Sequence, residues 1–375
     1  MTSTSKDPIL VVVQLTGGND YMNTLVPYND PLYYDYRPTL GIPQDRLLTI
    51  DGGLGLNPAL QPIKEMYDQG KVALINGIGY PNPNRSHFRS MDIWHTCEPD
   101  KVSNEGWLGR VIRDLDPYAE NVLTGVNFGR GLPRALALNG VPVASVAKLE
   151  SYGVLTGISD PEERLDALDL FSRMYAPISG TGQVMDYLGQ TGLDALKGAD
   201  ILKTAPGKYH SSVEYADTPI GQNLQGIAKV LCADLGTRVF YTQQIGYDTH
   251  ANQGPIQPAL LSDLSQALAD FDTDVREHDL SANVLTFVFT EFGRRVKDNG
   301  SGTDHGSGGL AFAMGDGVKG GMYGEYPSLR EEDLLEGDLC FNTDFRGVYA
   351  TLVERWLGLD AQPIVGGHFE QLEFA

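Results

Sequence analysis

The sequence has few cysteines, a deficit of positive charge and no long apolar run. Its three cysteines, Cys97, Cys232 and Cys340, are scattered and form no CxxC pair, so neither a disulfide framework nor a thiolate zinc site is indicated. Lys and Arg number 28 against 49 Asp and Glu, which gives a formal net charge of −21. This charge argues against long-range attraction to nucleic acid or to an anionic membrane surface. An anionic substrate would need a metal ion or a few focused arginines.

No segment has the features of a membrane span or a signal peptide. A span needs roughly 20 apolar residues, and no apolar run approaches that length. The polar residues 1–7 lead directly into the apolar residues 9–15. We therefore expect a cytoplasmic protein without a membrane span. The alternative is a periplasmic or otherwise exported protein whose leader has been removed.

Apolar strands alternate with helices along much of the chain. The continuous β-branched run 9–15 is typical of a central parallel strand that is buried on both faces. Repeated βα units of this kind predict an α/β protein whose mostly parallel sheet is covered by helices on both faces. Further strands are expected over 71–78, 238–245, 283–290 and 309–314, and helices over 58–67, 86–94, 255–278 and 344–357.

Residues 145–235 differ in texture, because they hold helical patterns and few strand candidates. No internal repeat or low-complexity segment is evident. We therefore treat residues 1–375 as one domain and predict that residues 145–235 form a helical cap or insertion within it.

Polar side chains of the kind that binds hard metals follow the predicted strands. Open parallel sheets bind ligands beyond the carboxyl ends of their strands, where loops converge. Taken alone, an Asp or Glu in such a place is often a turn former, and a lone His is often structural. Their shared position predicts one split metal site. Its segments are Asn19-Asp20, Asp248-Thr249-His250 and Glu291 after strands, Asp304-His305 before the strand at 309, and His87 in the loop after residue 78.

The donor set indicates the metal. Carboxylates and imidazoles without cysteine suit zinc, manganese, iron, calcium or magnesium, and the number of histidines favours a transition metal, zinc first. One or two divalent ions at such a site would polarise an anionic ester and help to deprotonate a hydroxyl nucleophile.

Ser86 is the candidate nucleophile. It lies where a helix is expected to begin, and the free N–H groups of a helix N-terminus favour a bound anion or alkoxide. An ordinary N-cap formed by Asn84 or Ser86 fits the same pattern. Arg85 and Arg294 are candidates to bind the anion, since a guanidinium matches oxyanions bidentately, although internal salt bridges are the alternative.

Seven segments resemble, in order, the family of domains of unknown function numbered 1501 (DUF1501), which is sulfatase-like and grouped with the alkaline phosphatase superfamily. The resemblance covers nearly the whole chain. It implies a three-layer α/β/α sandwich and hydrolysis or transfer of phosphate or sulfate esters at a one- or two-metal site. The segments are Gly17–Asp20, Tyr80–His87, Trp107–Arg110, Tyr247–His250, Thr290–Arg294, Gly302–Gly306 and Thr343–Arg346.

By this resemblance, Asp20 is the N-terminal metal ligand, Ser86 the nucleophile, and Asp248 and His250 the ligands of the other metal. Two placements compete for the late ligands. Either Asp304-His305 is the superfamily's Asp-His-Gly, or Glu291 takes that earlier place and His305 is the final ligand; we favour the second, with Asp304 assisting.

The sequence also departs from the superfamily pattern. The spacing Asp248-x-His250 is short, no Cys-x-Pro-x-Arg is present to become formylglycine, and His87 could itself bind metal in place of a role for Ser86. A twin-arginine leader, common in the family, is absent.

Two alternatives to a metal-dependent ester hydrolase follow. A metal-free Ser-His-Asp esterase lacks the GxSxG elbow. A degenerate member would bind a polysaccharide or an envelope partner without turnover. The expected substrate is a small-molecule or saccharide anionic ester.

Overall fold

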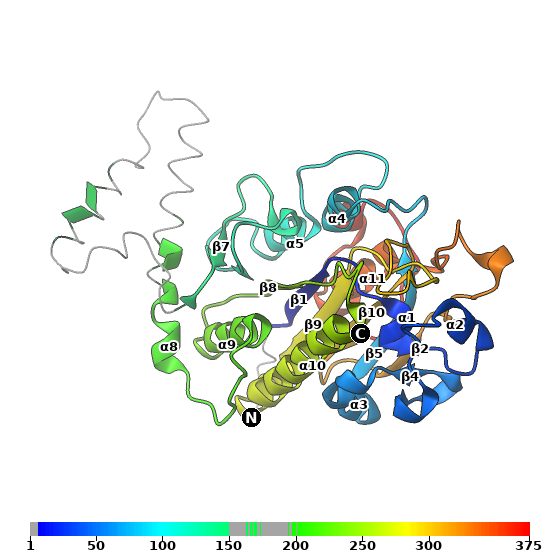
Figure 1. Cartoon of the computed structure of the whole chain (residues 1–375). Helices are drawn as coiled ribbons and strands as arrows, with labels where there is room; N and C mark the ends of the chain where they lie inside the picture. The colour runs from blue at the N-terminus through cyan, green and yellow to red at the C-terminus, as the bar shows by residue number, and fades with distance from the viewer. Residues whose placement is uncertain are drawn as a thin grey trace.

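A central sheet organises the chain. The computed structural model describes residues 7–149 and 201–375, together with residues 163, 166, 167, 169, 170, 173, 194 and 197–199. Within these residues nine strands form one sheet in the order β11-β5-β10-β9-β1-β8-β6-β7, with β12 paired to β5 (Figure 1). The strands are β1 (Ile9–Thr16), β5 (Val72–Gly79), β6 (Gly125–Phe128), β7 (Val143–Val146), β8 (Val239–Ile245), β9 (Val284–Thr290), β10 (Gly309–Met314), β11 (Gly321–Tyr323) and β12 (Thr343–Asp344).

The sheet is parallel except at β10, which runs antiparallel to both of its neighbours, β9 and β5. In the parallel centre, Leu10 of β1 is in register with Val239 of β8 and Leu285 of β9. Because β10 is reversed, its amino end lies at the edge where β1, β8 and β9 end. A segment that precedes β10 can therefore meet the loops that follow these three strands.

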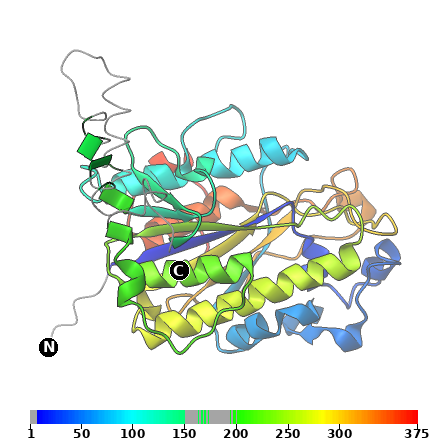
Figure 2. The ribbon, with the colours of Figure 1, turned by 60° about the vertical axis from the view of Figure 1, so that its left-hand side comes forward.

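Helices cover both faces of the sheet, as Figures 1 and 2 show. Val11 and Val13 of β1 join the core beneath α3, α9 and α10, whereas Leu10 and Val12 join the core beneath α4, α5, α11 and α12. These four side chains are completely buried, and each contributes roughly 1.5–3 kcal/mol through the hydrophobic effect. The predicted α/β sandwich with a mostly parallel sheet is confirmed.

The helices have the following bounds: α1 (Tyr21–Thr24), α2 (Pro31–Tyr36), α3 (Gln61–Asp68), α4 (His87–Thr96), α5 (Trp107–Leu115), α8 (Ala205–Lys208), α9 (Pro219–Cys232), α10 (Gln253–Glu277), α11 (Phe345–Thr351), which continues into a π-helical turn (Leu352–Trp356), and α12 (Gln362–Val365). Short 3₁₀ turns include η3 (Pro58–Leu60) and η4 (Arg134–Leu136). A small second sheet has the order β2 (Leu25–Val26), β4 (Gly55–Leu56), β3 (Leu48–Thr49).

The helix expected over 58–67 is a 3₁₀ turn followed by α3, and Asn57 caps its start through Ala59 N. Much of the insertion expected over 145–235 lies outside the described residues, so it stays a prediction. Its described C-terminal part includes α9, which packs against α10 and β8. Among the described residues, none of the helices combines the length and apolar character that a bilayer crossing requires.

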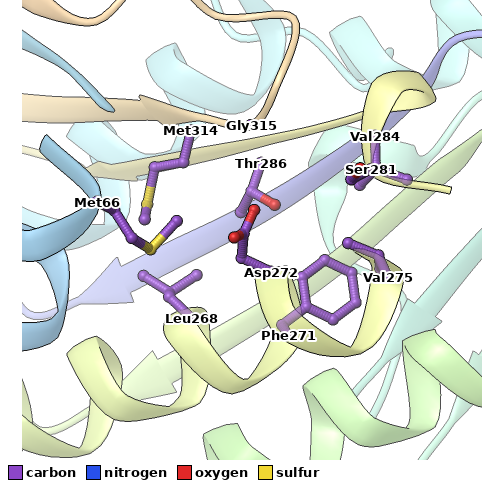
Figure 3. A pocket seen from close by; sticks show the side chains of 10 residues that line it. All are labelled: Met66, Leu268, Phe271, Asp272, Val275, Ser281, Val284, Thr286, Met314 and Gly315. Atoms are coloured by element: carbon purple, nitrogen blue, oxygen red, sulfur yellow. The ribbon is translucent and has the colours of Figure 1, made fainter. Parts of the chain in front are cut away.

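A small cavity lies between α10 and the sheet, at the end of β9 opposite to the strand-end loops. Figure 3 shows the side chains of Met66, Leu268, Phe271 and Met314 around it, near Val284 at the start of β9. Its volume is about 10 Å³, which is about the space of one water molecule. This cavity is a packing defect of the core and is too small for a substrate.

Candidate metal centre

Five loops meet at one edge of the sheet. Three of them follow the adjacent strands β9, β1 and β8, one connects β5 to α4, and one precedes the reversed strand β10. This is the edge at which the sequence predicted a shared site. Backbone hydrogen bonds hold these loops together. Thr303 N donates to Thr249 O, which joins two of the loops, and Tyr247 N donates to Thr16 O at the end of β1.

Three side chains from different loops bring potential ligand atoms together. His87, Asp248 and His305 each offer one ligand atom, and these atoms all lie within 4.8 Å of one another. Asp248 Oδ1 is the common point: it lies 3.4 Å from His87 Nε2 and 3.1 Å from His305 Nε2.

His250 adds a fourth donor to this group. Its Nε2 lies 3.1 Å from Asp248 Oδ1 and 2.9 Å from His305 Nε2. Four ligands around one ion with metal–ligand distances of 2.0–2.2 Å are separated by about 3.3 Å in a tetrahedron. The three separations from Asp248 Oδ1 and the one between His250 and His305, 2.9–3.4 Å, are close to that value.

Each imidazole is oriented through its other nitrogen. Nδ1 of His87 lies 2.9 Å from Glu291 Oε1, and Nδ1 of His250 lies 2.9 Å from Asp304 Oδ1. Nδ1 of His305 lies 2.7 Å from the backbone oxygen of Arg85. Carboxylate and carbonyl oxygens only accept, so all three Nδ1 atoms carry the proton. In the neutral rings, each Nε2 then presents a lone pair to the centre, as metal-binding histidines do.

His87 provides the test of whether a metal fits here. Its Nε2 is buried and makes no hydrogen bond. Buried polar atoms without a partner are rare and costly. The Nε2 atoms of His250 and His305, both lone-pair donors, would also repel each other at 2.9 Å. A cation between them removes both difficulties, so the residues fit a metal.

Asp248 is held by Arg294. The Nη2 of Arg294 lies 2.9 Å from Asp248 Oδ1. Burial opposes ionisation of Asp248, but the hydrogen bond and the charge of Arg294, together with the neighbouring rings of His305 and His87, outweigh it and lower the pKa of Asp248 to about 2. The carboxylate is therefore ionised and ready to bind a cation over the physiological pH range.

The pKa values of His87 and His305, which are both partly buried, are shifted in opposite directions. The hydrogen bond with Glu291 raises the pKa of His87 above its ordinary value. Burial lowers the pKa of His305, and the charges of His87 and Arg294 act in the same direction. Before metal binds, His87 thus holds a second proton more readily than His305 does.

Two glycines allow the loops to approach so closely. Gly17 has φ +120°, and a Cβ on it would lie 2.4 Å from Asp248 N. A Cβ on Gly302 would lie 2.2 Å from Thr249 O. Both contacts are shorter than any real side chain tolerates. The loops of Asp248 and Asp304 can be placed beside each other only because these positions lack a side chain.

Asp20, which the sequence predicts as a metal ligand, contacts an arginine and is not one of the four donors described above. Its carboxylate forms a two-point ion pair with Arg37, in which Nη2 lies 3.0 Å from Oδ1 and Nη1 contacts Oδ2. Gln253 Nε2 also donates to Oδ2, and both side chains of the pair are at most 1% exposed. In this arrangement the negative charge of Asp20 is neutralised by Arg37.

Glu291 and Asp304 also differ from the expected role of direct ligands. Glu291 is completely buried and accepts from Gly17 N, Thr290 Oγ1 and His87 Nδ1. Asp304 accepts from His250 and is largely exposed. Both orient a histidine, because their oxygens are directed at Nδ1 atoms.

Arg294 is not available to a substrate anion, contrary to expectation. It is 1% exposed, and its N–H groups donate to the backbone oxygens of Gly18, Thr303, Gly17 and Tyr247 as well as to Asp248. It ties together the three loops that form the centre. Removal of its side chain would leave several buried carbonyls without a donor.

Ser86 and Arg85 lie at the rim of the centre. Ser86 is exposed and stands at the N-cap of α4, but its side chain makes no cap hydrogen bond. The guanidinium of Arg85 pairs with Asp338 at 2.7 Å and with Glu336 at 3.2 Å, so an internal salt bridge takes most of its charge. What Arg85 gives to the centre is its backbone oxygen, the acceptor for His305.

Residues 189–366 match a family model described as "Protein of unknown function (DUF1501)". The match covers slightly less than half of the chain. The matched segment includes Asp248, His250, Glu291, Asp304 and His305. A comparison with curated proteins found no match.

Several solved structures are similar to this chain. One is a protein in the alkaline phosphatase superfamily from Vibrio parahaemolyticus, with 11% identity and a TM-score of 0.40 over 96% of this chain and 69% of that one. The PsFucS1 sulfatase from Pseudoalteromonas sp. has 11% identity and a TM-score of 0.40, over 98% and 71%. Alkaline phosphatase from the Antarctic bacterium TAB5 has 12% identity and a TM-score of 0.37, over 83% and 93%. At such identities the similarity concerns the arrangement of helices and strands, not the site.

Sequence reasoning missed the residues that neutralise or fix the predicted ligands. Arg37 and Gln253 hold Asp20, and neither belongs to a recognisable motif. An aspartate after a strand, such as Asp20, has the same local sequence pattern whether or not a buried arginine contacts it. The contact with Arg37 therefore could not be predicted from the sequence.

Proposed function

We propose that the chain is a metal-dependent hydrolase of phosphate or sulfate esters whose single divalent ion is bound by His87, Asp248, His250 and His305. One observation supports this proposal most strongly. The Nε2 atoms of three histidines gather around Asp248 Oδ1, and each ring is fixed through Nδ1 by a separate acceptor. Three imidazoles and one carboxylate suit zinc first, and manganese or iron next.

The number of ions follows from the carboxylates that remain. A second ion would need further oxygen ligands at the same edge. Asp20 is paired with Arg37, and Glu291 accepts three hydrogen bonds. The guanidinium of Arg37 supplies the positive charge beside Asp20 that a second ion would otherwise supply. We therefore assign one ion to the centre.

The chemistry combines the metal's charge with a hydroxyl at the helix start. A divalent cation bound here would polarise the ester and offset its negative charge, which matters in a protein with net charge −21. Ser86 is adjacent to His87 in sequence, is exposed, and begins α4. We assign attack to its Oγ: the hydroxyl loses its proton and bonds to phosphorus or sulfur, while the bond to the alcohol oxygen breaks and that oxygen takes up a proton. Water then breaks the bond between Oγ and phosphorus or sulfur, which releases phosphate or sulfate and restores the serine hydroxyl. The motif resemblance supports this class of ester.

The chain's own residues would keep the centre in its reactive form. Glu291, Asp304 and the backbone oxygen of Arg85 hold the three rings in the tautomer that leaves Nε2 free. Arg294 keeps Asp248 ionised and fixed in position. The centre is thus organised before substrate arrives, and preorganised electrostatics of this kind account for much of enzymatic rate enhancement.

The test begins with metal content. Protein purified without added metal, and then exposed to zinc and desalted, should hold one ion per chain by elemental analysis. His87→Ala should lose most of that ion, whereas His210→Ala should keep it, because His210 is exposed and contributes only its backbone oxygen to a described hydrogen bond. A folded wild-type chain that binds no zinc, manganese or iron would contradict the proposal and favour the non-catalytic binder.

Activity is tested next on aryl phosphate monoesters, phosphate diesters and sulfates. Hydrolysis of at least one class should disappear with a chelator and return with zinc. Ser86→Ala should abolish turnover without changing metal content. Full activity of Ser86→Ala would remove the serine from the mechanism, and activity that is insensitive to the chelator would indicate the metal-free esterase instead.

A further inference from the structure

An open cavity begins at the metal centre and continues along α4. Its volume is about 610 Å³, within the range of about 300–1,000 Å³ that is usual for small-molecule sites. His87 and Glu291 form the end next to the centre, and His95 lies further along the same helix. The eight residues between His87 and His95 correspond to about 12 Å of helix. The cavity is therefore long enough for a group of one or two rings.

Part of the cavity lining is apolar. Phe88 and Met91 line it, and Phe88 is 92% exposed. Phe88 directly follows the ligand His87 on the first turn of α4. An aromatic side chain this exposed has no packing role in the core, and its position at the start of a cavity makes it a contact surface for a bound molecule.

The far part of the cavity is polar but carries little net charge. Asp92 pairs with Arg89 at 3.1 Å and also with Arg134. Two arginines share this one carboxylate, which leaves an excess of one positive charge in a strongly acidic protein. His95 is held through Nε2, at 2.9 Å from Gln14 Oε1. Burial lowers the pKa of His95 to about 3, so this ring stays neutral.

We propose that this cavity binds the alcohol portion of the ester, and that this portion has a flat apolar face that packs on Phe88 and Met91. The inference rests on the proposed function. In an ester, the alcohol is joined to the anionic group, so it must leave the metal centre through adjacent space. The cavity shares His87 and Glu291 with the centre and provides that space. An aromatic ring and the C–H face of a sugar both have the required chemistry.

The experiment measures binding rather than turnover. The zinc-loaded chain is titrated calorimetrically with phenylphosphonate and with methylphosphonate, whose C–P bonds resist hydrolysis and whose anionic groups are the same. Phenylphosphonate should bind roughly fivefold more tightly, or better, because its ring gains an aromatic contact. A phosphonate analogue of glucose 6-phosphate separates the two sources: tighter binding of this analogue than of phenylphosphonate assigns the cavity to a sugar.

Matched variants locate the effect. Phe88→Ala should reduce the ratio of the two affinities to about one or two while the zinc content stays at one ion. Tyr118→Ala is the control, because Tyr118 is 84% exposed and does not line the cavity. Its ratio should equal that of the wild type. Neither side chain contributes to the core, so both variants are expected to fold.

The possible failures are distinct. Equal affinities of the wild type for the phenyl and methyl compounds, no binding of either, or an unchanged ratio in Phe88→Ala would each overturn the inference. A chain that hydrolyses esters with zinc and still shows equal affinities would retain the proposed function and lose only this assignment. A chain that binds no metal would lose the proposed function itself.

Discussion

Replacement of Glu291 by glutamine is expected to weaken metal binding at the centre without unfolding the chain. Glu291 is buried, and its Oε1 accepts from Gly17 N and His87 Nδ1, both at 2.9 Å, while Oε2 accepts from Thr290 Oγ1 at 3.0 Å. A glutamine oxygen can accept the first two bonds. Its amide nitrogen can donate to Thr290 Oγ1, because that hydroxyl can direct its own proton to Leu15 O.

The magnitude follows from the change in charge. The hydrogen bond with Glu291 raises the pKa of His87, which makes the ring a stronger base and a better ligand. A neutral amide gives less support. Loss of a carboxylate that orients a metal-bound histidine commonly costs 10–100-fold in metal affinity, which is about 1.4–2.7 kcal/mol. Because every polar group keeps a partner, the free energy of unfolding of the metal-free chain should change by about 1 kcal/mol or less.

The assay is a zinc titration of the metal-free chain in competition with a chromophoric chelator near neutral pH. Urea denaturation of the same metal-free samples measures the fold separately. Glu65→Gln is the matched control, since Glu65 is an exposed residue of α3 and undergoes the same chemical change. Glu65→Gln should bind zinc as the wild type does.

A dissociation constant for Glu291→Gln within about twofold of the wild-type value would refute the reasoning. It would mean that His87 is not a ligand, or that Glu291 does not orient it. An equal loss of affinity in Glu65→Gln would point to overall charge and not to the contact with His87.

Asp20→Asn should lower the free energy of unfolding, measured in urea, by about 3–5 kcal/mol, because it leaves the charge of buried Arg37 uncompensated. The zinc content should stay at one ion per chain. A loss of the ion would return Asp20 to the ligand set. The folded-state pKa of Asp248 is lowered from 3.8 to about 2, so its ionised form stabilises the metal-free chain above the unfolded-state pKa, and this contribution is lost as pH falls through about 2. The stability difference between wild type and Asp248→Asn in urea should therefore shrink between pH 5 and pH 2, and a difference that grows would contradict the assignment. Gly17→Ala should weaken zinc binding, because its Cβ would displace Asp248. Gly300→Ala is the control: Gly300 also has a positive φ but has open space around it, so the variant should lose about 1 kcal/mol of stability and keep its zinc affinity. Equal zinc affinities of the two variants would count against the close approach of Gly17 to Asp248.

The sequence alone was sufficient to predict β1, β5, β8, β9 and β10 and the edge at which the site lies, but not β6, β7, β11 and β12. The run at residues 9–15 is apolar at every position except Gln14, which is the local signature of a strand buried on both faces, and β1 has almost the same bounds. Polar segments directly after such strands must lie at the carboxyl edge of a parallel sheet. The positions of Asp248 and His250 followed from these two local facts.

The sequence did not determine which polar groups face the ion. Asp20 and Asp248 both follow central strands, but Arg37, 17 residues from Asp20, neutralises the first, and Arg294 holds the second next to three histidines. Glu291 follows its strand as a ligand would, yet His87, 204 residues away, turns it into an orienting acceptor. Charge pairs of this kind depend on distances in space, and no local pattern encodes them.

The sequence predicted strand β10 but not its reversed direction. Its apolar run has no feature that fixes its direction, because an antiparallel strand buried on both faces has the same pattern as a parallel one. Its direction places His305 at the edge of the site. Local hydrophobicity thus determined the layers and the strand ends of this protein, whereas long-range pairing of charges and strands decided which side chains form the centre.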